Sequence, residues 1–296
     1  MFNNLSESKL EDFLIFWLDE KKFEISQTTY NNYSKIIQNH LIPSLGNIKI
    51  KDISDSDIEV YLIEKAERGF SNKTIIKHFQ ILKQVLDKAI YLNLIKYNTA
   101  DFVNLPKIKK TKQYTLSKRE IEKLLAVAKE YDEWIYNFIV VTLFTGMRRN
   151  ESLGITWNDI DFEKKTIHLT QKLNYVPGQG INLITLSDQI QRKIFINKKV
   201  INILKHIKNK QLTLKYLLKS KYHNKYNLVF CKDHGDIYQP ASVTRKFNQI
   251  VGIASLSDEI SIHSLRNTYA THLFENNVSP RQIKDQLGIN ILNNLF

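Results

Sequence analysis

The stretch HSLRNTYATHLFENN, residues 263–277, sets a histidine, an arginine and an asparagine at helical spacing. At about 100° per residue, His263, Arg266 and Asn267 share one face of a helix, whereas Tyr269 lies on the opposite, core-packing face. An imidazole can transfer a proton near neutral pH, and a guanidinium can hold two phosphate oxygens at once. The pattern predicts a face that binds an anion and moves protons. The alternative is that His263 caps the helix or lies on a solvated surface.

A second basic segment, TLFTGMRRNESLGITWNDIDF, covers residues 142–162. A buried helix reaches Gly146, the chain turns, and Arg148 opens the next helix. Glu151 follows three residues later, where it can pair with Arg148 and hold its guanidinium still. Arg148 and Arg266 together would clamp a phosphodiester and stabilise the charge of phosphoryl transfer without a metal. The alternative is a purely structural Arg148–Glu151 ion pair.

The charge of the chain favours a polyanionic partner. Its 296 residues carry 43 Lys and Arg against 30 Asp and Glu, a net charge of +13. Such an excess attracts nucleic acid, although a merely lysine-rich solvated surface is the alternative. Cys231 is the single cysteine, which excludes an internal disulfide and fits a reducing compartment. No apolar run approaches the roughly 20 residues that span a bilayer, and the N-terminal residues do not resemble a secretion signal. We expect a cytoplasmic protein that does not enter the membrane.

The order of predicted elements divides the chain in three. Residues 1–103 are mostly helical, with Pro43 and Gly46 predicted to end the second helix. The stretch NLPKIKKTKQYT, residues 104–115, has no amphipathic period and is predicted to be an exposed basic linker. Residues 116–296 are predicted to be helical around one small sheet. The linker lysines, which we expect to contact DNA, are Lys107, Lys109, Lys110 and Lys112.

The sheet is predicted from residues 164–196, KKTIHLTQKLNYVPGQGINLITLSDQIQRKIFI. The segment alternates, is rich in β-branched residues and turns at Pro177 and Gly178, which indicates two or three antiparallel strands. The fold class expected for the whole chain is therefore mainly α with a small antiparallel sheet.

The two arginine segments together resemble the boxes of the tyrosine recombinases, or phage integrases. TGMRRNESLGITWNDID, residues 145–161, is similar to their pattern T-G-x-R-x-x-E followed by L-x-W-x-D-I-D. HSLRNTYATHLFENNVSPRQIKDQLG, residues 263–288, is similar to H-x-L-R-[HN]-T-x-A-T-x-L followed by an L-G step. Both boxes in order, with a hairpin between them, are highly specific. Residues 1–103 then resemble the helical, SAM-like core-binding domain, and 116–296 the catalytic domain.

The resemblance implies a reaction and a set of roles. In the family a tyrosine near the C-terminus attacks a DNA phosphate and becomes joined to its 3′ side. By resemblance Arg148 and Arg266 hold that phosphate, His263 assists proton movement, and Glu151 and Asn267 support them. A lysine on the hairpin protonates the leaving 5′ oxygen, and no cofactor takes part. The expected partner is double-stranded DNA, on which the family assembles as a tetramer.

The hairpin departs from the family pattern. At the place of the family's lysine this sequence has Leu186, and Lys172 and Lys193 are the nearby candidates for the acid. After the L-G step the family has His or Trp, and here Ile289 follows.

The nucleophile is also missing from its expected place. No tyrosine occurs after Tyr269, and the sequence stops at Phe296, before the family's spacing is reached. We therefore expect a recombinase cut short before its tyrosine, monomeric off DNA, which binds DNA but does not cleave it alone. The alternative is a catalytically inactive DNA-binding protein that occupies attachment sites.

Other motifs predict no further chemistry. Cys231 and His234 have a two-residue gap, but no second ligand pair follows, so a zinc site is not expected. The turn NYVPGQG lacks the ending of a phosphate-binding loop. We expect neither a metal nor a bound cofactor.

Overall fold

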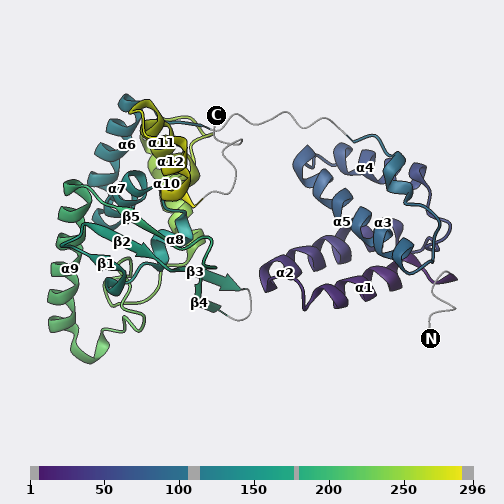
Figure 1. Ribbon diagram of the computed structural model, residues 1–296, viewed down its shortest axis with the longest axis horizontal. Helices are drawn as coiled ribbons and strands as arrows, with labels where there is room; N and C mark the ends of the chain where they lie inside the picture. Colours follow the sequence, from purple (N-terminus) through teal and green to yellow (C-terminus); the bar gives the residue numbers. More distant parts are fainter. Residues whose placement is uncertain (1–6, 106–113, 177–179, 289–296) are drawn as a thin grey trace. The chain divides into compact units, whose positions relative to one another are not determined.

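The computed structural model describes residues 7–105, 114–176 and 180–288 of the chain (Figure 1). The chain divides into two compact units, Met1–Thr111 and Lys112–Phe296. The four linker lysines, the turn at Pro177 and Gly178, and Ile289 lie outside the described residues.

The N-terminal unit is a helical bundle around one apolar core. Trp17, Phe13 and Tyr61 are among its fully buried side chains. Three of its helices have a serine as N-cap. The side chains of Ser26, Ser54 and Ser71 each accept a hydrogen bond from the backbone N–H three residues later, which stabilises the first turn. The helices are α1 (Leu10–Lys21), α2 (Gln27–Ile36), α3 (Ile42–Leu45), α4 (Asp55–Glu67) and α5 (Asn72–Tyr91), with a 3₁₀ turn at Thr99–Phe102.

The prediction that Pro43 ends the second helix is wrong. A π-helical turn, Ile37–Leu41, continues α2 directly into α3, where Pro43 lies in the first turn. Proline has no N–H to donate and its ring clashes with the carbonyl four residues earlier. The π turn, in which the N–H of Ile42 donates to the carbonyl of Ile37, widens the helix directly before the proline. Gly46 does cap the end of α3, as predicted.

The C-terminal unit is built around α7 (Glu133–Thr145), which is buried over most of its length. Helices α6 (Lys118–Tyr131), α9 (Lys198–Leu218) and α11 (Ile262–Glu275) pack against α7 (Figure 1). An apolar helix of this kind must be covered on several sides. The remaining helices are α8 (Arg149–Gly154), α10 (Pro240–Ile253) and α12 (Pro280–Leu287), with 3₁₀ turns at Trp157–Asp159 and Lys219–Lys221.

Five short strands form two antiparallel sheets in the described residues. One sheet has the order β1–β2–β5, and the other is the hairpin β3–β4. The register places His168 opposite Lys193 in the first sheet and Lys172 opposite Ile184 in the hairpin. The bounds are β1 (Ile160–Asp161), β2 (Thr166–Leu169), β3 (Gln171–Val176), β4 (Gly180–Thr185) and β5 (Arg192–Phe195).

The expected fold class, mainly α with a small antiparallel sheet, is confirmed, but the expected strand count is too low. The described part of residues 164–196 holds four strands rather than two or three. Only Thr170 separates β2 from β3, and its carbonyl accepts from the N–H of Leu186 at 2.8 Å. Alternation alone does not reveal this change of partner, because both strands keep a period of two. Within the described part of the chain, no helix is both long and apolar enough to cross a bilayer.

Candidate active site

The two arginine segments meet at the end of α7. Gly146 ends that helix in the left-handed conformation, with φ of 64°. A Cβ there would lie 2.5 Å from Cδ1 of Tyr269 and 2.7 Å from Cδ2 of Leu287, so only glycine allows α11 and α12 this close. The chain then extends through Arg148, the N-cap of α8. The turn therefore brings Arg148 beside the N-terminal half of α11.

A hollow of about 410 Å³ lies where these elements meet. Arg148, Lys172, His263 and Arg266 line it, together with Glu151. The structure thus gathers four of the five predicted catalytic side chains from α8, β3 and α11. The fifth, Lys193, lies on β5 and is not among the side chains that line the hollow. Leu186, at the place of the family's lysine, is buried in the core.

Arg148 is both ion-paired and accessible. Its Nη1 donates to Oε1 of Glu151 at 2.8 Å, and its backbone N–H donates to Oε2 at 2.8 Å. Its side chain is nevertheless 43% exposed. The ion pair that the sequence predicts is therefore compatible with a guanidinium that receives an anion.

Glu151 is buried among three arginines. Its Oε2 accepts from Nη2 of Arg192 at 2.8 Å and lies 4.0 Å from Nη1 of Arg266. Burial alone would raise the pKa of this carboxyl group, but the hydrogen bond and charge of Arg192, followed by the N–H and charge of Arg148, lower it to about 2. Glu151 is therefore ionised at neutral pH and holds the cluster together.

Arg266 is almost fully buried and fixed by backbone oxygens. Its Nη1 donates to the carbonyl of Gly146 at 2.7 Å, and its Nη2 donates to the carbonyl of Leu287. Burial, and then the charge of Arg148, lower the pKa of Arg266 below its usual range. Since its position is set by main-chain groups, it presents a preorganised positive charge to the hollow.

His263 lies on the exposed side of the hollow. Surrounding protein atoms partly desolvate its ring and lower its pKa, and the charges of Arg266 and Arg148 lower it further. The ring is therefore neutral at pH 7 and can accept a proton. Neutral histidine beside two guanidinium groups is suited to proton movement at a bound anion.

Asn267 and Tyr269 lie away from the hollow. Asn267 is buried, and its Oδ1 has no hydrogen-bond partner among the described atoms. Tyr269 packs in a small cluster with Ile283 and Leu287, and its hydroxyl donates to Oε1 of Gln286 at 3.1 Å. Burial raises its pKa. The placement of Tyr269 on the core side of the helix agrees with the sequence pattern.

Two arginines near the site were not singled out from sequence. Arg192 is buried against Glu151, although it opens an otherwise alternating strand. Arg149 lines the hollow, and its Nη1 donates to Oγ1 of Thr244 at 2.7 Å. The available signals were a charged residue at a strand position beside apolar ones, and a second arginine next to Arg148. Buried arginines need partners, and sequence does not show which partners are near.

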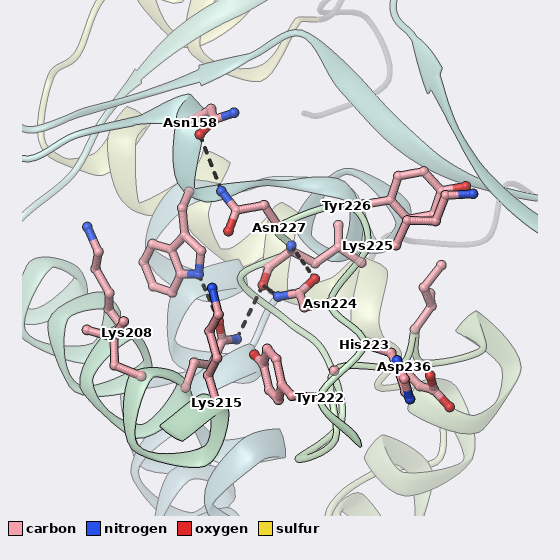
Figure 2. A pocket seen from close by; sticks show the side chains of 16 residues that line it. Asn158, Lys208, Lys215, Tyr222, His223, Asn224, Lys225, Tyr226, Asn227 and Asp236 are labelled. Carbon is pink, nitrogen blue, oxygen red and sulfur yellow. Dashed lines mark hydrogen bonds between the residues drawn. The ribbon is translucent and has the colours of Figure 1, made fainter. Parts of the chain in front are cut away.

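A larger cavity than this hollow, about 930 Å³, lies elsewhere, beside α9 and residues 222–237 (Figure 2). Several of its polar side chains bind one another and the nearby backbone. The indole N–H of Trp157 donates to Gln211, which in turn donates to the carbonyl of Val229, and Asn227 donates to Asn158. These bonds hold a loop in place. We therefore assign the candidate site to the smaller hollow, where charged groups converge.

Among the described residues no group of three or more His, Cys, Asp and Glu side chains is placed to hold a metal ion. Cys231 is buried, which raises its pKa to about 11, and it is close to amide side chains rather than to further thiols or imidazoles. That the reaction needs neither metal nor cofactor stays a prediction.

Family models match most of the chain. Residues 114–293 match the Phage integrase family, and residues 9–65 match the Phage integrase, N-terminal SAM-like domain. Among curated proteins, the tyrosine recombinase XerC-like protein of Caldanaerobacter subterraneus subsp. tengcongensis is 27% identical, over 97% of this chain and 78% of the relative. The ICEBs1 integrase of Bacillus subtilis is 24% identical, over 88% of this chain and 70% of the relative.

Solved structures share the fold. The Tn1549 transposon integrase in complex with a circular intermediate DNA matches with a TM-score of 0.85 and 20% identity, over 97% of this chain and 93% of that one. A lambda integrase dimer bound to a COC′ core site matches with a TM-score of 0.73 and 18% identity, over 99% and 79% of the two chains.

Proposed function

Because the chain belongs to the phage integrase family, we propose that it is an integrase-type site-specific recombinase that acts on double-stranded DNA of a mobile element. The names of its relatives support this activity, since they are tyrosine recombinases and an integrase. Several matched structures are integrases bound to DNA, and one is a lambda integrase tetramer on a Holliday junction. We further propose that this chain is located in the cytoplasm, binds double-stranded DNA and is monomeric away from DNA, whereas its family assembles as a tetramer on DNA.

The observation that carries the proposal is the pair Arg148 and Arg266 in one hollow with His263. A phosphodiester has two non-bridging oxygens and one negative charge, which two guanidinium groups can bind in a bidentate manner. During transfer a tyrosine oxygen would bond to phosphorus while the bond from phosphorus to the 5′ oxygen breaks. The arginines would stabilise the charge that develops on the phosphorus oxygens.

The leaving 5′ oxygen must gain a proton. We propose Lys172 for this role in preference to Lys193, because Lys172 lines the hollow and projects from the β3–β4 hairpin. His263, neutral at pH 7, would take up a proton at the same phosphate. Glu151, which is hydrogen-bonded to Arg148 and Arg192, would keep Arg148 in place.

We also propose that the two domains have different roles. Residues 1–103 would form a core-type DNA-binding domain, residues 116–296 would carry the reaction, and the linker lysines in 104–115 would bind DNA phosphates. The positive charge of the chain supports this arrangement.

We propose further that the 296 residues bind DNA without forming a covalent link to it. No tyrosine lines the hollow in the described part of the chain, and the hydroxyl of Tyr269 is held by Gln286. A phosphate clamp without a nucleophile cannot form the covalent intermediate. The same observation favours the second candidate function, a catalytically inactive protein that occupies attachment sites.

One experiment tests both proposals. Duplexes are enriched from a random-sequence library by binding to the chain, and nicked suicide substrates are then built from the enriched sequence. We expect related duplexes to be enriched and no protein–DNA adduct to survive denaturing electrophoresis. Failure to enrich any duplex would overturn the recombinase assignment. An adduct would overturn the second proposal, and the DNA-linked peptide would identify the nucleophile.

A further inference from the structure

Three arginines bind the C-terminal end of α12. The last carbonyls of a helix have no partner within the helix, and they carry partial negative charge. Here the carbonyl of Gln286 accepts from Nε of Arg192 at 2.8 Å, and that of Leu287 accepts from Arg266. The carbonyl of Gly288 lies 3.5 Å from Nη2 of Arg148. Successive carbonyls therefore contact the same guanidinium groups that surround Glu151.

Arg192 makes the most complete set of these contacts. Its side chain is 5% exposed, and Nη2 and Nη1 lie 2.8 Å and 3.4 Å from the two carboxylate oxygens of Glu151. Its Nε donates to the carbonyl of Gln286, so all three nitrogens of the guanidinium group have a hydrogen-bond partner. A Cβ on Gly288 would lie 3.0 Å from Nη1 of Arg192, so the glycine leaves room for the arginine.

Arg192 does not line the hollow, yet it is one contact away from a side chain that does. Glu151 binds Arg192 through Oε2 and Arg148 through Oε1. A buried carboxylate with one partner removed keeps its desolvation cost and shifts toward the partners that remain. Without Arg192, the carboxylate would turn toward Arg266, which is 4.0 Å away, and Arg148 would lose its fixed acceptor.

We propose that Arg192 is a positioning residue for the phosphate site. It fixes Glu151, and through Glu151 the guanidinium of Arg148, while it holds the last turn of α12 against β5. The docking of that turn and the orientation of Arg148 are thereby coupled. This inference rests on the proposed function, because it assumes that Arg148 binds a DNA phosphate.

The test uses the full chain and a duplex enriched by the wild-type protein. Single methylphosphonate substitutions, which remove one phosphate charge at a time, identify the phosphate whose loss weakens the wild type but not Arg148→Ala. The variants Arg192→Gln and Arg192→Lys are then compared on the native and the substituted duplex. Arg281→Gln, an exposed position on α12, is the matched control for the loss of an arginine charge.

We expect Arg192→Gln to weaken binding about tenfold, as expected for Arg148→Ala, and to become insensitive to the methylphosphonate. The double variant Arg148→Ala/Arg192→Gln should bind no more weakly than either single variant, because both changes remove the same contact. The effects of Arg281→Gln and Arg148→Ala should multiply. A variant that is only less stable would still bind the methylphosphonate duplex more weakly than the native duplex, so loss of this difference is specific to the phosphate contact.

Arg192→Lys covers the case in which Arg192→Gln does not fold. It keeps a positive charge beside Glu151 but lacks the planar fork that reaches Glu151 and Gln286 together. We expect it to fold and to lose sensitivity to the methylphosphonate. Retained sensitivity in a folded Arg192 variant, or multiplying effects with Arg148→Ala, would overturn the inference. A wild-type chain that enriches no duplex would refute the proposed function instead.

Discussion

Glu151→Gln should destabilise the C-terminal unit in a manner that depends on pH. The pKa of Glu151 is lowered from 4.5 to about 2. That difference of about 2.5 units corresponds to about 3 kcal/mol of stability at pH 7. Because the pKa of Glu151 is depressed in the folded state, the ionised carboxylate stabilises the folded protein. The stabilisation is fully present above about pH 4.5, and it is lost as the pH falls through the folded pKa.

The measurement is urea denaturation followed by tryptophan fluorescence. Trp17→Phe in both proteins leaves Trp134 and Trp157 as reporters, and both lie in the C-terminal unit. We expect Glu151→Gln to lower the free energy of unfolding of this unit by about 3 kcal/mol at pH 7. About 2 kcal/mol of that difference should disappear by pH 3, since the carboxyl group is by then protonated in the unfolded chain, where its pKa is about 4.5, but still mostly ionised in the folded protein.

Glu163→Gln is the matched control, because Glu163 is an exposed glutamate of the same unit. It should change the free energy of unfolding by less than about 0.5 kcal/mol at either pH. An equal destabilisation by Glu151→Gln at pH 7 and pH 3 would refute the reasoning, because the effect would then come from shape rather than charge.

Three further predictions concern DNA binding to an enriched duplex. Arg148→Ala should weaken binding about tenfold while the C-terminal unit stays folded, and Arg148→Lys should not restore binding, because lysine lacks the planar fork; an unfolded Arg148→Ala would show a purely structural role. Alanine at all four linker lysines should lower the slope of log affinity against log salt by about 3 to 4 units, and an unchanged slope in filter binding would count against phosphate contacts. Affinity for the duplex should rise as the pH falls from about 8 to about 6, because a bound phosphate raises the lowered pKa of His263 and favours its protonated form. His263→Ala should remove this pH dependence in the same titration. If the variant keeps the pH dependence, His263 is not the group responsible.

Local sequence was sufficient to identify the helices and the two basic boxes. The helical period depends on neighbours three and four residues away, so the helix that carries His263 and Arg266 could be predicted from its own residues. The ion pair between Arg148 and Glu151 spans three residues and was visible for the same reason. The resemblance to integrases rested on these local motifs, and the family match over residues 114–293 confirms it.

Tertiary packing decided the rest. Lys172 and Lys193 are equivalent as sequence, and only the separation of β3 from β5 shows which of them faces the hollow. The place of Arg192 could not be predicted either, since its partners are 41 and 94 residues away. Strand pairing and buried ion pairs join distant segments, and their geometry is set by how the helices pack around α7. Sequence by itself determined which chemistry was available, and the fold determined which of those groups meet.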